Sequence, residues 1–362
     1  MARVITVTSG KGGVGKTNIS LNLALHLAKE GYRTCLFDAD MGLANINILL
    51  GLYPEFTMED VILNGKGIDD IMIKDFNGID IIPGSSGVQK MTELDETEIK
   101  RMVDSLSKLD SYDFLLVDTS AGISKNVISF CLASSEVMLV LTPEPTSLTD
   151  GYALLKVLSL NGFEGSVMVS VNQCKNMQTA DIVFKKFREA VHKYLPLRVQ
   201  PLGSVVHDRS VREAVKEQNP FLLHSPGSNA SKCIKNIGRH LILKENALTE
   251  SMGDVCFWER CVTFFAGPVK LPGRTSGKRK NPNSMAPSHV AYGKGEKGSP
   301  ANDKDRTIEK KGSVPGMKDN TLPEQDMSMF LRVLAEGIST MSYELVAIRK
   351  VMEADRRRRE PA

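Results

Sequence analysis

The chain has 362 residues, of which 46 are Lys or Arg and 43 are Asp or Glu, giving a formal net charge of +3. A hydrophobic content of 41% and a charged content of 25% are typical of a globular protein. The sequence contains no run of 18 apolar residues, the length that a membrane-spanning helix requires. The six cysteines form no CxxC pair, which argues against a disulfide framework or a zinc site. Residues 1–6 lack the charged and then apolar layout of a signal peptide, so we expect a cytoplasmic protein.

Residues 1–243 read as alternating strands and helices. Short β-rich runs occur at 4–8, 34–38, 79–83, 114–118, 137–141, 167–172 and 202–206. The stretches between most of them show helical spacing, as in Ile19-Leu23-Leu27. This alternation predicts an α/β fold with a mostly parallel, doubly wound sheet in a single domain.

A phosphate-binding loop follows the first strand. The pattern GxxxxGK[ST] is met by Gly10, Lys11, Gly12, Gly13, Val14, Gly15, Lys16 and Thr17. A helix pattern opens directly behind it, so the motif has the strand-loop-helix context that phosphate binding requires. We expect Lys16 to reach the β- and γ-phosphates of a nucleotide and the Thr17 hydroxyl to bind Mg²⁺.

Carboxylates end two of the other predicted strands. Asp38 and Asp40 close the strand at 34–38, and Asp118 closes the strand at 114–118 after four apolar residues. Ligands of open parallel sheets gather at the carboxyl ends of the strands. We therefore predict that Asp38 and Asp118 help to hold the metal.

The loop and the segments downstream of it resemble a known family. Lys11 adds a second lysine to the phosphate loop, and Asp38-Ala39-Asp40 follows the second strand. Together they are similar to the deviant Walker A ATPases of the MinD/ParA group. Residues 81–87, 142–150 and 211–215 further resemble the FlhG/FleN branch, MinD-like ATPases that set flagellar number and placement in bacteria.

The resemblance implies roles for individual residues. Lys11 would cross a dimer interface to the partner's nucleotide, and Asp40 would orient the attacking water. Asn172 and Asp208 would line the adenine, while Glu144 and Asp150 would lie at the dimer interface. The cofactors would be ATP and Mg²⁺. Iron–sulfur relatives need paired cysteines at the dimer seam, and Cys131 has no evident companion.

Residues 244–267 contain a candidate membrane-docking helix. On a helix, Phe257, Trp258 and Phe265 share one apolar face, as expected of a helix that lies in a lipid interface. Arg260 is its lone cation, whereas such helices tend to be rich in Lys and Arg. The alternative is a C-terminal helix that packs on the core of the domain.

The rest of the tail divides into two parts. Residues 268–326 hold 7 Pro and 7 Gly and few apolar residues, which predicts a disordered linker. Residues 327–362 combine an arginine-rich tail, 356–359, with heptad spacing of Met327, Leu331, Leu334, Ile338, Met341, Leu345, Ile348 and Met352. This spacing favours a coiled-coil or partner helix, and a helix lying back on the ATPase domain is the alternative.

Two functions follow as hypotheses. The leading one is a MinD-like ATPase that dimerises with ATP and regulates flagellar number or placement through reversible peripheral binding to the inner membrane. Its partners would be flagellar assembly proteins, such as an FlhF-like GTPase or switch-complex proteins. The alternative is a ParA-like ATPase that positions a chromosome, plasmid or other cargo by binding DNA. Residues 1–243 hold 25 basic and 27 acidic residues, so the basic balance belongs to the tail.

Overall fold

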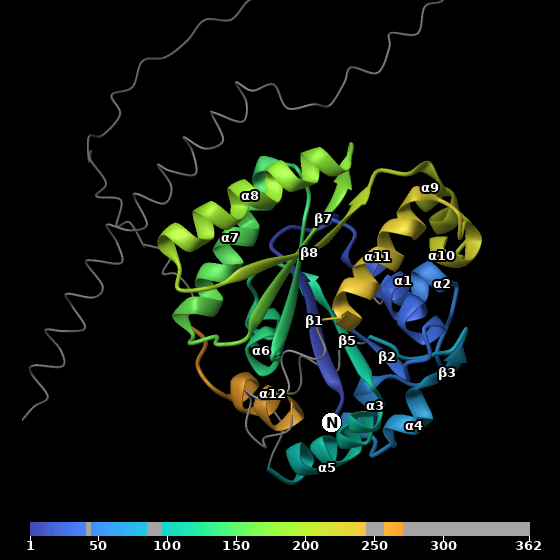
Figure 1. Cartoon of the computed structure of the whole chain (residues 1–362). Helices are drawn as coiled ribbons and strands as arrows, with labels where there is room; N and C mark the ends of the chain where they lie inside the picture. Colours follow the sequence, from blue (N-terminus) through green and yellow to red (C-terminus); the bar gives the residue numbers. More distant parts are fainter. Residues whose placement is uncertain (41–44, 85–95, 244–256, 271–362) are drawn as a thin grey trace, which may run out of the picture.

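The computed structural model describes residues 1–40, 45–84, 96–243 and 257–270. Its centre is an eight-stranded sheet in the order β3-β4-β2-β5-β1-β6-β7-β8 (Figure 1). The strands are β1 (Arg3–Ser9), β2 (Thr34–Ala39), β3 (Ile73–Phe76), β4 (Ile79–Ile82), β5 (Phe114–Ala121), β6 (Glu136–Leu141), β7 (Ser166–Cys174) and β8 (Val199–Val206). Every neighbouring pair is parallel except β3 and β4, so the predicted fold class is confirmed.

All seven predicted strands are present, and β3 was not predicted. It pairs with β4 through a tight hairpin at Asn77 and Gly78, which have φ angles of 50° and 88°. Asn-Gly is a strong hairpin signal. The strand before it escaped prediction because Lys74 and Asp75 interrupt its apolar character.

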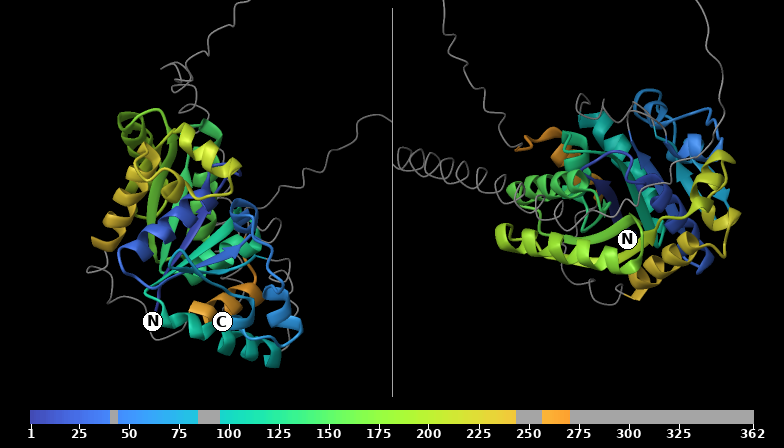
Figure 2. Two further views of the ribbon diagram at one scale, coloured as in Figure 1. Left: turned by 90° about the vertical axis from the view of Figure 1, so that its right-hand side faces the viewer. Right: turned by 90° about the horizontal axis from the view of Figure 1, so that it is seen from above.

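Helices cover both faces of the sheet (Figures 1 and 2). One face packs against α1 (Lys16–Lys29), α2 (Asn45–Leu50), α9 (Arg209–Lys216), α10 (Phe221–His224) and α11 (Asn229–Leu243). The other packs against α3 (Met58–Leu63), α4 (Ile68–Ile71), α5 (Glu96–Leu106), α6 (Lys125–Ala133), α7 (Pro145–Leu160), α8 (Met177–Tyr194) and α12 (Phe257–Ala266). A 3₁₀ helix, η2 (Ser107–Ser111), follows α5.

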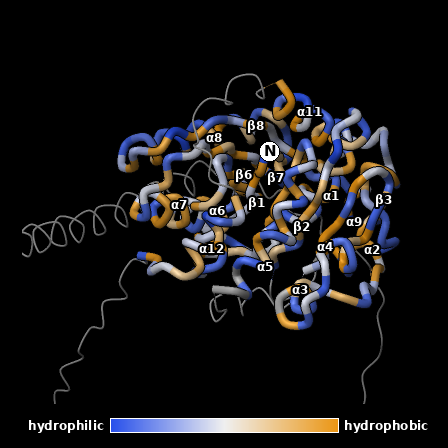
Figure 3. Tube along the Cα trace, turned by 90° about the horizontal axis from the view of Figure 1, so that it is seen from below, coloured by the Kyte–Doolittle hydropathy of each residue, from blue (hydrophilic) through white to orange (hydrophobic). Residues whose placement is uncertain are grey.

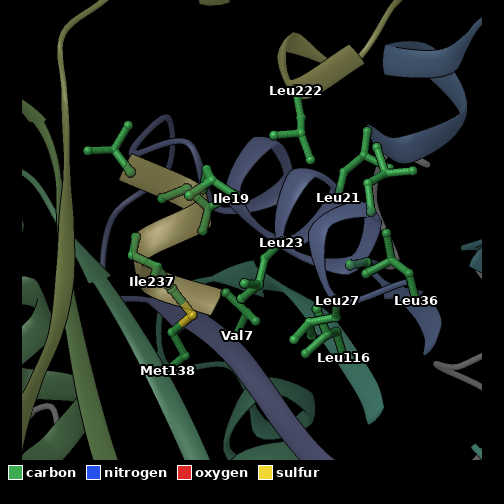
Figure 4. Close-up of a cluster of buried hydrophobic side chains, with 14 of the residues drawn as sticks. Val7, Ile19, Leu21, Leu23, Leu27, Leu36, Leu116, Met138, Leu222 and Ile237 are labelled. Carbon is green, nitrogen blue, oxygen red and sulfur yellow. The ribbon is translucent and has the colours of Figure 1, made fainter. Parts of the chain in front are cut away.

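Helix α1 lies in the middle of one apolar layer. Figure 4 shows its side chains between the sheet and the helices α10 and α11, with Leu23 near Val7 and Ile237. The side chains of Ile19, Leu23 and Leu27 are almost completely buried. Burial of this kind stabilises by about 1.5–3 kcal/mol per large apolar side chain. The helix that begins at the phosphate loop is therefore held firmly in the core.

Helix α12 packs on the core of the domain, which is the alternative arrangement given above for this segment. Phe257, Trp258 and Phe265 are at most 5% exposed. The Trp258 ring meets Phe37 of β2 edge-on at 5.7 Å, and the Phe265 ring meets Phe130 of α6 at 5.1 Å. Figure 3 shows hydrophilic (blue) and hydrophobic (orange) residues alternating along α8 and α12, as expected for amphipathic helices. In this arrangement the core of the domain covers the apolar face of α12.

The two edges of the sheet are irregular. Edge strand β3 has only four residues, and Asp75 within it has a φ of 54°. At the opposite edge, β8 contains Pro201, which has no N–H to donate, and its register shifts at Leu202. Both features make a strand a poor template for adding another strand.

The predicted linker after residue 270, the heptad segment and the arginine-rich tail lie outside the described residues. Among the described helices, none combines the length and the hydropathy that crossing a bilayer demands.

Candidate functional site

The phosphate loop lies between the carboxyl end of β1 and the amino end of α1. Gly13 and Gly15 have φ angles of 76° and 89°, a conformation that glycine adopts without strain. Gly15 is the N-cap of α1, and no side chain caps this helix end. A Cβ added at Gly12 or Gly13 would meet nothing within 4 Å. The loop thus presents open backbone and a positive helix end, which is the arrangement that binds phosphate.

Lys16 lies at the start of α1 among three carboxylates. Its side chain is buried, with 7% of the residue exposed. Burial lowers the pKa of Lys16, and attraction by Asp118, Asp40 and Asp38 opposes that shift. The ammonium is therefore held close to these three carboxylates, which lie at the ends of β2 and β5. A ligand phosphate would supply a further negative partner to this poorly hydrated cation.

Asp118 and Asp38 are neighbours across β5 and β2, where their Cα atoms are in register. Ser20 donates a hydrogen bond from Oγ to Asp118 Oδ1 at 2.8 Å, and Thr17 bonds the same carboxyl group. Asp118 Oδ2 is buried and has no hydrogen-bond partner among the described residues. Burial raises the pKa of Asp118 to about 6, although Lys16 lowers it. Mg²⁺ binds carboxylate oxygens, so the unpartnered oxygen of Asp118 fits the binding of a Mg²⁺ ion that accompanies a phosphate ligand.

Asp38 is completely buried, and two backbone N–H groups bond its carboxyl group. Asp40 donates to Oδ1 at 3.1 Å, and Ile46 donates to Oδ2 at 3.2 Å. Burial, followed by repulsion from Asp118, raises the pKa of Asp38 to about 8. Two adjacent buried carboxyl groups and the hydroxyl of Thr17 are hard oxygen ligands, which fit a divalent cation. Such a cation would relieve the repulsion that raises the pKa of Asp38.

Asn172 connects the carboxyl end of β7 to the phosphate loop. Its Nδ2 donates to the Val14 carbonyl oxygen at 2.7 Å, and its Oδ1 accepts from the Gln173 N–H at 2.8 Å. Gln173 has a φ of 56° and donates from Nε2 to the Gly13 carbonyl oxygen at 3.3 Å. Both side chains therefore brace the loop from the side on which the resemblance places the adenine.

Asp208 is the N-cap of α9 and joins two helix ends. Its Oδ1 accepts from the Ser210 N–H at 3.0 Å, and its Oδ2 accepts from the Ala230 N–H of α11 at 3.1 Å. Burial raises the pKa of Asp208, but these hydrogen bonds outweigh burial and hold the pKa below its usual value. Both carboxylate oxygens thus have a structural role that the sequence did not indicate.

Lys11 is directed toward α7 of its own chain. Its Nζ lies 2.5 Å from Glu144 Oε2 and 2.9 Å from Thr146 Oγ1. Asp150 lies one turn further along α7, where its backbone faces Gly10: a Cβ on Gly10 would come within 2.1 Å of the Asp150 carbonyl carbon. The predicted interface residues therefore lie beside one another and beside the phosphate loop.

The structure brings most of the predicted site together. Lys16, Thr17, Asp38 and Asp118 form one cluster with Asp40 at its edge, whereas α12 and its aromatic residues lie on the other face of the sheet. Sequence reasoning missed Ser20, Thr146 and Gln173, which position Asp118, Lys11 and the loop. Thr146 lies within the segment 142–150 but had no role assigned to it, and Ser20 and Gln173 lie in no motif. Each acts on a residue that only folding brings near.

Comparisons with known proteins agree with this geometry. Residues 1–242 match the family model described as "ParA: NUBPL iron-transfer P-loop NTPase". The antiactivator FleN of Pseudomonas aeruginosa is 41% identical over 238 residues, which is 66% of this chain and 85% of that protein. The flagellum site-determining protein YlxH of Helicobacter pylori is 32% identical over 67% of this chain and 82% of its own length.

Solved structures show the same fold. The septum site-determining protein MinD of Pyrococcus horikoshii, complexed with Mg-ADP, aligns with a TM-score of 0.55 and 25% identity over 70% of this chain and 100% of its own. MinD in the MinC:MinD cell division complex of Aquifex aeolicus aligns with a TM-score of 0.54 over 70% of this chain and 98% of its own. The matched family model, the FleN relative and the phosphate loop point the same way: the chain belongs to the ParA/MinD family of P-loop ATPases.

Proposed function

We propose that the chain is an ATP-switched dimer that regulates flagellar number or placement. The observation that carries the proposal is the buried cluster of Lys16, Asp38 and Asp118 beside an open phosphate loop. The likeness to FleN and YlxH supports the flagellar role. Iron transfer is not proposed, because the described cysteines are buried and burial raises the pKa of Cys131 to about 12, which disfavours the thiolate.

The residues of the site have distinct tasks in this proposal. Lys16 and the loop backbone bind the phosphates, while Thr17, Asp38 and Asp118 hold Mg²⁺. The metal, when bound, neutralises charge that develops on the phosphates. Asp40 lies near enough to attract Lys16, and we assign it the orientation of the attacking water. Lys11 supplies positive charge to the nucleotide of a second copy, as an arginine finger does.

Two variants test the switch. Lys16→Ala removes the phosphate-binding cation and should leave the chain monomeric with ATP. Asp40→Ala leaves phosphate binding intact but slows hydrolysis, so the ATP dimer should accumulate. Gel filtration with ATP and with ADP distinguishes the two states. If both variants elute as monomers with ATP while ATP binding by Asp40→Ala is intact, the dimer switch is wrong.

Membrane binding requires α12 to exchange one apolar environment for another. The core buries its aromatic face, so leaving the core is compensated only where lipid covers the same surface. Trp258 is the single tryptophan of the chain and reports this exchange directly. With vesicles of anionic phospholipid brominated in the acyl chains, Trp258 fluorescence should be quenched with a slowly hydrolysed ATP analogue and not with ADP. Fluorescence that stays unquenched with the analogue, in a chain that does dimerise, rejects this part of the proposal.

One observation favours the DNA-binding alternative. Residues 175–198, which include α8, hold six basic and two acidic residues, although residues 1–243 as a whole are slightly acidic. Lys185 and Lys193 are exposed on this surface. A mobility shift of DNA that needs ATP, weakens steeply with salt and is lost in Lys185→Glu/Lys193→Glu would support a ParA-like function. Lys125→Glu, a charge reversal on α6, is the matched control.

The biological role is tested in cells. Deleting the gene should change the number or position of flagella, and the Lys16→Ala variant should fail to restore them. The partners would be flagellar assembly proteins, such as an FlhF-like GTPase or switch-complex proteins. A normal flagellar count together with mis-segregated DNA would instead support the ParA-like, DNA-binding function.

A further inference from the structure

The ammonium of Lys11 is held by two side chains at the start of α7. Lys11 Nζ donates to Glu144 Oε2 at 2.5 Å and to Thr146 Oγ1 at 2.9 Å. Glu144 is the N-cap residue of α7, yet its side chain makes no capping hydrogen bond. The carboxylate is instead directed at the lysine. A side chain that forgoes the usual role of an N-cap residue is available for another one.

Both ends of this contact are firmly placed. Gly10 packs so closely on α7 that a Cβ would lie 2.1 Å from the Asp150 carbonyl carbon, and a Cβ on Gly151 would lie 2.5 Å from Leu141 Cδ2. Ser9 also donates from Oγ to the Lys11 carbonyl oxygen at 2.7 Å. The backbones of the loop and of α7 therefore keep a fixed separation. Only the long, flexible side chain of Lys11 has to move for the contact to open.

We propose that Glu144 and Thr146 are positioning residues that hold Lys11 on its own chain until a second copy loaded with ATP presents its phosphates. The inference rests on the proposed function, in which Lys11 acts across a dimer. The contact sets an energetic threshold for dimerisation, because each chain loses one ion pair and one hydrogen bond when the dimer forms. The contact therefore disfavours dimerisation without a nucleotide, because a neutral or absent ligand offers Lys11 nothing in exchange.

The strength of the contact suits a reversible device. The side chains of Lys11 and Glu144 are 37% and 57% exposed. Exposed ion pairs are weak, so the threshold is low enough for ATP phosphates to overcome. Because two such pairs open in every dimer, their removal should tighten the ATP dimer by about two- to thirtyfold.

The first experiment measures the dissociation constant of the ATP dimer by analytical ultracentrifugation. Glu144→Gln should lower that constant, Thr146→Val should lower it less, and Thr146→Ser should restore the original value because it keeps the hydroxyl. Glu164→Gln removes an exposed charge and Thr149→Val removes an exposed hydroxyl one turn along α7, so neither should tighten the dimer. An unchanged or weaker dimer in both Glu144→Gln and Thr146→Val overturns the inference.

The second experiment reads the contact in the monomer and needs no dimerisation. Competitive acetylation with mass spectrometry gives the reaction rate of Lys11 relative to Lys125 with ADP, at a concentration where gel filtration shows monomer. The rate should rise by about 1.4- to fivefold in Glu144→Gln, since one exposed ion pair is lost, and stay unchanged in Glu164→Gln. An equal rate in Glu144→Gln and wild type contradicts the inference. If wild type fails to dimerise with ATP while labelling changes as expected, the proposed function fails and the contact stands.

Discussion

Trp258→Ala should detach α12 from the domain or destabilise the whole fold. Trp258 is 1% exposed and contacts Phe37 and Phe257 edge-on, with ring centroids 5.7 Å and 4.8 Å away. A tryptophan buries about 150–250 Å². At about 25 cal/mol per Å² this corresponds to roughly 4–6 kcal/mol, an upper bound. Truncations of large buried aromatic residues cost about 3–5 kcal/mol, and we expect a loss in that range.

The assay is guanidinium unfolding of the full chain, followed by circular dichroism, together with hydrogen exchange of residues 257–266. If α12 is held less strongly than the rest of the fold, exchange accelerates in the helix while global stability falls by less than the full amount. Trp258→Phe should cost less than Trp258→Ala. It leaves a smaller cavity and removes an indole N–H that has no hydrogen-bond partner among the described residues.

Tyr53→Ala is the matched control, because this aromatic residue is 93% exposed. Its effect should stay within about 0.5 kcal/mol. A Trp258→Ala variant that matches wild type within that margin, both in unfolding and in exchange, would refute the packing argument. Trp258 would then contribute no more than a surface residue.

Three further predictions concern other parts of the molecule. Gly10→Ala forces a Cβ into the backbone of α7, so ATP affinity measured by equilibrium dialysis should fall at least about tenfold. Arg3→Met leaves the buried carboxylate of Glu136 without its partner at 2.6 Å and should lower the free energy of unfolding by about 3–5 kcal/mol in chemical denaturation. For nucleotide-free protein, the free energy of unfolding should fall as pH rises from about 4 to about 8. The pKa of Asp38 is raised to about 8 in the folded chain, so in this pH range the folded chain keeps a proton on Asp38 that the unfolded chain has lost.

Each of these predictions has a control. Gly227→Ala adds a Cβ that meets nothing within 4 Å and should bind ATP normally. Arg33→Met breaks the exposed pair with Asp113 and should cost much less stability than Arg3→Met. Asp38→Asn removes the group that titrates at the highest pH and should reduce the slope, most of all above about pH 6, because the pKa of Asp118 is raised only to about 6. Normal ATP binding by Gly10→Ala would contradict the argument from close packing. Equal losses of stability in Arg3→Met and Arg33→Met would contradict the argument from the buried ion pair. A stability that rises between about pH 4 and pH 8 would contradict the argument from Asp38.

Much of the architecture could be predicted because the strands are buried on both faces. Residues 137–141 of β6, for example, form a continuous apolar run, and the glycine pattern of the phosphate loop is specific. Strand β3 escaped because an exposed edge strand with Lys74 and Asp75 lacks that signal. The apolar face of α12 was recognised, but a hydrophobic pattern identifies a face and not what covers it.

Contacts between distant residues could not be predicted from the sequence. Lys11 and Glu144 are 133 positions apart, and no pattern in either segment indicates that they meet. The double capping by Asp208 depends on the start of α11, which lies 22 positions away. Sequence reasoning therefore located the phosphate-binding and carboxylate residues, whereas the residues that position them became visible only in the fold.

The irregular edges of the sheet bear on how copies of this chain can meet. The short β3 with its left-handed Asp75 and the bulged β8 with Pro201 both oppose the extension of the sheet from one molecule to the next. Contacts between described parts of two copies are thereby directed to side chains. Interfaces of side chains can open and close within one catalytic cycle, whereas a continuous backbone ladder tends toward fibrous, nearly irreversible assembly. The same irregularities that protect against aggregation thus favour an association that is renewed with each nucleotide.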